Sequence, residues 1–142
     1  MKTPPIKIFY WNRATYLHRA FDNLIANVDR HQNQFLITKD WRMILIDHSR
    51  SFRTGKDTQT GIDLTKNLIY TEKHKEGPKL MRELPRALVE KIKALDFQMI
   101  KDAVGEYLTD KEINAILIRK ELIIKEIDKL IAQYGEENVL YD

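Results

Sequence analysis

The chain of 142 residues contains no cysteine and no long apolar run. The absence of cysteine excludes disulfide bonds and thiolate metal sites. No run of 18 apolar residues is present, which argues against a membrane span. The start of the chain, Met-Lys-Thr-Pro-Pro, lacks the apolar core of a signal peptide. We therefore expect a cytoplasmic protein with no membrane span.

Glycine is also scarce, with five residues in the whole chain. They are separated from one another, and none belongs to a glycine-rich loop of the kind that covers nucleotide phosphates. They lie at Gly55, Gly61, Gly77, Gly105 and Gly135.

Composition otherwise indicates one ordinary globular domain spanning residues 1–142, with 43% hydrophobic and 32% charged residues. The net charge of +3 is uneven, because residues 1–56 carry +6 and residues 57–142 carry −3. A basic half favours an anionic ligand such as a nucleotide, a phospholipid or a nucleic acid. A solvated surface with a slight excess of lysine and arginine explains the same bias without any ligand.

The pattern of the first half predicts one helix followed by a hairpin. Proline at positions 4 and 5 predicts an extended lead-in over residues 1–11. Apolar residues at helical spacing predict a helix from Asn12 to about Val28. Two strands, Gln34 to Thr38 and Trp41 to Ile46, follow, and the apolar run in the second predicts cover on both faces. Residues 53–80 are polar and predict a long loop.

The last third predicts three helices. Pro85 suits the first position of a helix that runs to about Ala94, and Asp96 can cap a helix from Phe97 to about Tyr107. Thr109 and Glu112 have the spacing of a capping box, and Gly135 ends the long helix that the box begins. The apolar stripe of that helix comprises Ile113, Ile116, Leu117, Ile123, Ile124, Ile127, Leu130, Ile131 and Tyr134. The expected fold class is therefore α+β, mostly α, with a short hairpin and a helical C-terminal bundle.

Two acids, Asp29 and Asp47, bracket the predicted hairpin. Asp47 follows a strand expected to be buried, where a carboxylate is costly without a partner such as a metal. Asp29 is expected at the end of a helix, where the dipole disfavours an acid. Residues that local energetics disfavour are candidates for function, although a lone acid of this kind is most often a turn residue.

The motif around these acids resembles a known class of enzymes. Asp29-Arg30-His31, then a hairpin, then Ile46-Asp47-His48 is similar to the catalytic core of phosphoinositide-kinase-like and HipA-like kinases. The longer pattern from Phe21 to Arg53 resembles a family of uncharacterised bacterial proteins with that fold. The resemblance implies a kinase-like large lobe with Mg²⁺ (or Mn²⁺) and ATP as cofactors. It makes Asp29, with Arg30 and His31, the catalytic loop, and Asp47 the metal-binding acid.

The amide ligand departs from the kinase pattern. Kinase loops place a metal-binding Asn five residues after the catalytic Asp, and here that position is Gln34 while Asn33 lies one residue earlier. Either Gln34 substitutes for that ligand or the loop shifts and Asn33 serves. A third reading is a pseudokinase that has lost one metal site.

Further polar residues follow the second acid. His48, Arg50 and Arg53 are candidate contacts to substrate or phosphate, and the two arginines could instead pair with acids of the long loop. His31 and His48 do not predict a zinc site, since no third ligand is suitably spaced.

A kinase also needs a small lobe with a phosphate-covering loop and a phosphate-binding lysine. Neither pattern is found in these 142 residues. We therefore expect a kinase-like phosphotransferase lobe that requires a small lobe or partner chain, with an unidentified acceptor substrate. The alternative is a non-enzymatic basic module that binds nucleic acid or a phosphoprotein.

Overall fold

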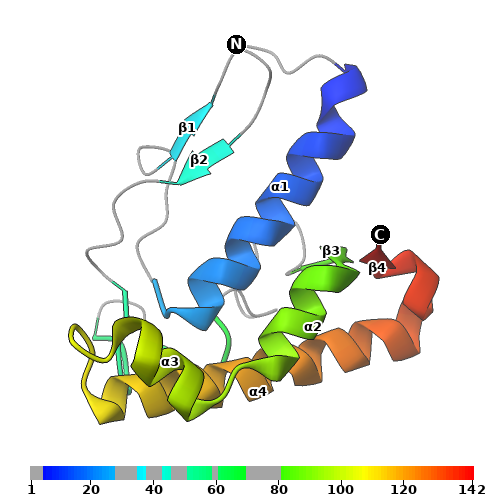
Figure 1. Ribbon diagram of the computed structural model, residues 1–142. Coiled ribbons are helices and arrows are strands. Elements are labelled where there is room, and N and C mark those ends of the chain that lie inside the picture. Colours follow the sequence, from blue (N-terminus) through cyan, green and yellow to red (C-terminus); the bar gives the residue numbers. More distant parts are fainter. Residues whose placement is uncertain (1–4, 28–34, 38–42, 46–50, 59–60, 70–80) are drawn as a thin grey trace.

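The computed structural model describes the backbone of residues 5–27, 35–37, 43–45, 51–58, 61–69 and 81–142. Side chains are described for residues 12–27 and for the last three of those ranges. Within these residues the fold is α+β and mostly helical, as predicted (Figure 1). The helices are α1 (Pro5–Leu24), α2 (Arg86–Ala94), α3 (Phe97–Val104) and α4 (Asp110–Tyr134), followed by a short 3₁₀ turn, η2 (Glu136–Asn138).

The predicted hairpin is present. Strand β1 (Phe35–Ile37) pairs antiparallel with β2 (Met43–Leu45), with Phe35 opposite Leu45 and Ile37 opposite Met43. The remaining residues of the two predicted strands, the turn between the strands and the cover of their side chains lie outside the described residues. In Figure 1 the hairpin lies on one side of α1, away from α2 and the C-terminal end of α4.

A second, parallel pairing was not predicted. Strand β3 (Leu84–Pro85) pairs with β4 (Leu140–Tyr141), with Leu84 opposite Leu140. Pro85 therefore precedes α2 as its N-cap instead of being its first helical residue. The pairing holds the end of the chain beside the start of α2 (Figure 1).

Helix α4 is the centre of the fold, because α1, α2 and α3 all pack on it. Its buried apolar residues are mostly those of the predicted stripe, with Ile113 and Ile123 at 0% exposure. The main core joins α4 to α1, α2, the two short parallel strands and the loop before them. It consists of Ala20, Leu68, Met81, Leu84, Val89, Ile123, Ile127, Leu130, Val139 and Leu140.

The predicted start of α1 at Asn12 is wrong, since the helix begins at Pro5. Proline breaks a helix only in its interior. At the first helical position its missing N–H is one of four that have no intrahelical acceptor, and its φ already suits the helix. Residues 5–11 are therefore helical and do not form an extended lead-in.

The predicted end of α1 near Val28 is also wrong, since the helix ends at Leu24. Ala26 takes a left-handed backbone with φ 54°. The Asn27 N–H donates to the Asp22 carbonyl oxygen (2.8 Å) and the Ala26 N–H to that of Asn23 (3.4 Å). This bond pattern is a Schellman termination, which glycine usually forms. Asp29 therefore lies beyond the last turn, and the argument from the helix dipole does not apply to it.

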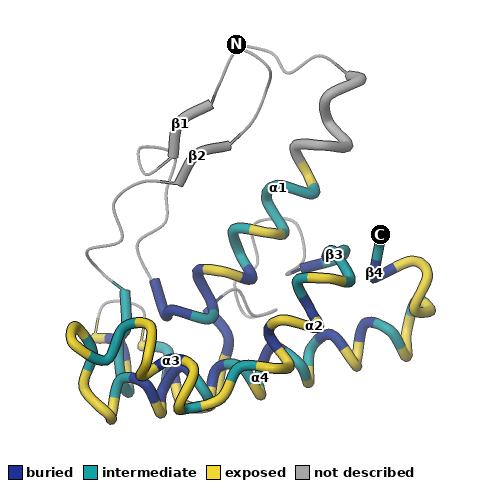
Figure 2. The backbone as a smooth tube through the Cα atoms, in the orientation of Figure 1, coloured by how far each residue is buried: buried dark blue, intermediate teal, exposed yellow. Residues whose placement is uncertain are grey.

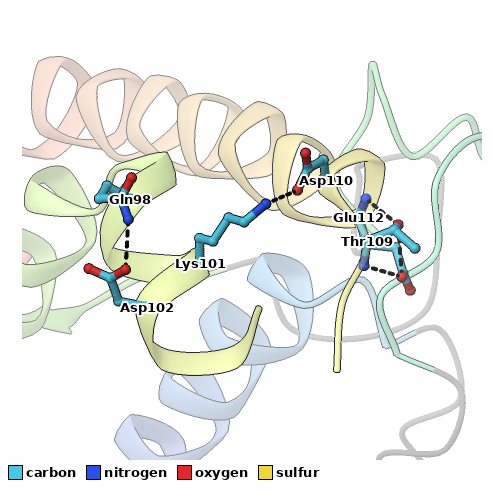
Figure 3. Close-up of polar contacts among 6 residues, drawn as sticks. All are labelled: Gln98, Lys101, Asp102, Thr109, Asp110 and Glu112. Carbon is cyan, nitrogen blue, oxygen red and sulfur yellow. Dashed lines mark hydrogen bonds and ion pairs between the residues drawn. The ribbon is translucent and has the colours of Figure 1, made fainter. Parts of the chain in front are cut away.

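The predicted caps of the later helices are confirmed. Asp96 accepts from the Met99 N–H at the start of α3, and Gly135 follows the last residue of α4 with φ 87°. The capping box forms both ways, because Thr109 Oγ1 accepts from the Glu112 N–H and Glu112 Oε1 accepts from the Thr109 N–H (Figure 3). Helix α3 ends at Val104, three residues before the predicted end at Tyr107.

The capping box supports a stability prediction. Replacing Thr109 by alanine leaves the Glu112 N–H without its acceptor, and we expect a loss of about 1 kcal/mol in the free energy of unfolding. Urea denaturation followed by circular dichroism measures this loss. Thr58→Ala, in an exposed loop, is the matched control, expected within about 0.5 kcal/mol of the wild type. Equal stability of the two variants would contradict the prediction.

Candidate functional site

Most of the predicted site residues lie outside the described part of the chain. The two acids, Asp29 and Asp47, are among them. So are Arg30, His31, Asn33, Gln34, His48 and Arg50. What the structure describes is the backbone of the hairpin between the acids, the segments that enter and leave this region, and the side chains that hold those segments.

The entering and leaving segments are joined to each other. The Phe52 N–H donates to the Ile25 carbonyl oxygen (2.5 Å). The Phe35–Leu45 pair joins the same stretch of chain again at the hairpin. Asp29 belongs to the sequence between Ile25 and Phe35, and Asp47 to the sequence between Leu45 and Phe52. Each acid therefore belongs to a segment of the chain with a backbone pairing at both of its ends, Ile25 with Phe52 at one and Phe35 with Leu45 at the other.

Backbone strain occurs at both junctions. Ala26 (φ 54°) and Phe52 (φ 63°) are the residues other than glycine with positive φ in the described part of the chain. A side chain in this region costs about 1 kcal/mol or more and persists where the surroundings impose it. Such residues cluster at functional sites, so their position on either side of the candidate segment is informative.

The predicted contact residue that the structure does describe is Arg53. Its Nη1 lies 3.8 Å from Oδ1 of Asp57, whose side chain is fully buried. This contact is the one expected if Arg53 pairs with an acid of the loop. The loop itself folds back through an antiparallel bridge between Lys56 and Asp63.

Sequence reasoning missed the residue that connects these segments, Arg119 of α4. Its side chain is 1% exposed. Its Nε donates to the Asn23 carbonyl oxygen, and Nη2 donates to Oδ1 of the same residue (3.0 Å). Its Nη1 donates to the carbonyl oxygens of Leu64 (2.7 Å) and Asn67 (3.1 Å). Burial lowers the pKa of Arg119 to about 10, so it stays charged at neutral pH.

Asn23 is the second residue of this connection. Its Oδ1 also accepts from the Ile69 N–H (2.6 Å), and its Nδ2 donates to the Arg19 carbonyl oxygen (2.9 Å). One buried amide therefore links the last turn of α1, the loop after the candidate site and α4. Figure 2 shows the burial at this end of α1. A weak sequence signal existed, because Arg119 falls between Ile116 and Ile123 in the apolar stripe.

Two further polar residues of α1 lie in the same region. Asp22 is 0% exposed, and its Oδ2 lies 3.3 Å from Nδ1 of His18. Asp22, Asn23 and Asn27 at the end of α1 are all buried, as are Arg119 of α4 and Asp57 of the loop.

Among the described residues, no group of three His, Asp or Glu side chains could hold a metal ion. Asp29 and Asp47 are not among these residues. No helix in the described part of the chain has the length and apolar character needed to cross a membrane. Comparisons with known proteins found no matching family model, curated protein or solved structure.

Proposed function

We propose that the chain is the large lobe of a kinase-like phosphotransferase and binds a magnesium–nucleotide complex through Asp47 and the catalytic loop at Asp29. The observation that carries the proposal is the bounded hairpin. Asp29 precedes it and Asp47 follows it, and the Ile25–Phe52 bond joins the chain on the outer side of both acids. The strained backbone at both junctions and the basic first half of the sequence support the same proposal.

The residue types suit the chemistry. Magnesium prefers hard oxygen ligands, and the carboxylate of Asp47 with the amide oxygen of Asn33 or Gln34 provides such a set. A bound ion neutralises the charge of the nucleotide phosphates. The carboxylate of Asp29 then orients the acceptor hydroxyl and accepts its proton, which is the main chemical task left to the protein. Arg50, in the basic half of the sequence, is a candidate contact for phosphate oxygens.

Calorimetric titration of the chain with ATP tests the proposal. We expect binding in the presence of Mg²⁺ and none in the presence of a chelator. We also expect tighter binding when a small lobe that covers the phosphates is supplied, because the patterns for that lobe are not found in these residues. Absence of binding under all these conditions would refute the proposal. Binding of nucleic acid that weakens steeply with salt and needs no magnesium would instead favour the basic binding module.

A further inference from the structure

The contacts of Arg119 divide evenly between two parts of the chain. Two of its hydrogen bonds go to Asn23, in the last turn of α1, and two go to Leu64 and Asn67, in the loop. Asn23 lies a few residues before Asp29, and the loop follows Asp47. A single guanidinium therefore holds the segment that leads into the candidate site against the segment that leads out of it.

A buried arginine carries a large desolvation cost at this position. All four acceptors are neutral oxygens, so no carboxylate among them compensates the buried charge. A buried cation in such surroundings costs more than an apolar side chain of similar size. Packing alone is served by isoleucine or leucine, which fill the neighbouring positions of the stripe. The gain from arginine is directional, because its planar fork presents five N–H donors in a fixed geometry.

The residue also has a rigid base. Arg119 lies in the middle of α4, a helix of 25 residues capped at both ends. The apolar residues before and after it, Ile116 and Ile123, are buried in two different core clusters. The backbone that carries the guanidinium is thus fixed by a capped helix and by two core clusters, one of which also includes Ala20 of α1 and Leu68 of the loop.

We propose that Arg119 is a positioning residue, which sets the spacing between the segment before Asp29 and the segment after Asp47. The inference rests on the proposed function for its consequence in nucleotide binding, whereas the placement of the two segments is testable without it. Arg119 does not touch the nucleotide in this scheme and acts through Asn23 and the loop. Misplacement of a site by a distant change can weaken it strongly even when the fold survives.

Arg119→Lys is the variant that separates positioning from folding. Lysine keeps the positive charge and the long stem, but its three donors lie on one nitrogen and cannot reproduce the planar fork that reaches the acceptors of both segments. We expect the dissociation constant for Mg²⁺–ATP to rise by about tenfold or more, as for the loss of supporting residues around metal sites. The matched control is Arg86→Lys, the same change at a position whose contacts are with Glu136 and Asp142 on the surface.

Hydrogen exchange supplies the second measurement, at a temperature where circular dichroism shows both variants folded. Arg119→Lys is expected to speed exchange in residues 51–69 and leave α2 and α3 unchanged. Wild-type affinity in the folded variant would overturn the inference, since a purely structural role predicts that result. So would exchange that rises uniformly along the chain. If the wild-type chain binds no nucleotide, the proposed function fails, and hydrogen exchange alone then tests the positioning role. Faster exchange confined to residues 51–69 supports that role, and faster exchange along the whole chain overturns it.

Discussion

Arg119→Met is expected to lower the free energy of unfolding by about 3 kcal/mol. Methionine fits the apolar stripe but cannot donate a hydrogen bond. The carbonyl oxygens of Asn23 and Leu64 then lose their Arg119 donors at buried positions, and the carbonyl oxygen of Asn67 loses its donor at a partly buried one. Each such loss costs about 1 kcal/mol or more. Methionine also removes the desolvation cost of the buried charge, which offsets part of the stability lost with the hydrogen bonds. The expected loss is therefore smaller than the sum over the four bonds.

Urea denaturation followed by circular dichroism measures this effect. Ile118→Met is a close control, because it places the same side chain at the adjacent position, where Ile118 is 42% exposed. That control is expected to stay within about 0.5 kcal/mol of the wild type. A stability of Arg119→Met equal to that of the control would show that the four hydrogen bonds contribute nothing to the fold.

Asp47→Asn is expected to weaken the binding of Mg²⁺–ATP by about 100-fold or more, since even the loss of a residue outside the metal's own ligands costs 10- to 100-fold. The amide keeps the size of the carboxylate but removes the charge that attracts the cation. Because magnesium links the protein to the phosphates, nucleotide affinity falls with metal affinity. Isothermal titration calorimetry with ATP, carried out with and without a chelator, measures the nucleotide affinity and its dependence on magnesium.

Asp128→Asn is the control for this change. It removes one negative charge from an exposed position of α4, so it matches the change in net charge without touching the candidate site. We expect its affinity for Mg²⁺–ATP to equal that of the wild type. If Asp47→Asn also binds Mg²⁺–ATP with the wild-type affinity, Asp47 is not a metal ligand, even though the chain binds nucleotide.

Sequence predicted the elements whose signals are local. The capping box at Thr109 and Glu112, the cap at Asp96 and the glycine after α4 each depend on residues within one turn of the helix end. The hairpin follows from short apolar runs separated by polar residues, which are also local. These predictions succeed because the interactions that decide them involve neighbouring residues.

The C-terminal end of α1 could not be predicted in the same way. Its termination places an alanine in the left-handed region, and nothing in the local pattern marks Ala26 as a helix end. Ala26 is 1% exposed and packs with Leu64 and Ile69 of the loop, while the preceding residue bonds to Phe52. Tertiary contacts therefore decide where α1 stops, and they override the helical spacing that continues to Val28.

The role of Arg119 is non-local in the same sense. Its partners lie 52 to 96 residues away in the sequence, so no motif joins them. Sequence shows an arginine within an apolar stripe, but it does not show which oxygens it meets. At the candidate site the sequence contributes more than the structure. The sequence provides the motif from Asp29 to Asp47, and the structure describes the hairpin backbone and the flanking segments.

The most direct test of the central claim is a crystal structure of the chain with Mn²⁺ and a non-hydrolysable ATP analogue, with the ion located by anomalous scattering. We expect one ion bound by the Asp47 carboxylate, the amide oxygen of Asn33 or Gln34, and phosphate oxygens, with the Asp29 carboxylate facing the same cleft. Carboxylates of Asp29 and Asp47 that point apart, with no ion at Asp47, would contradict the claim.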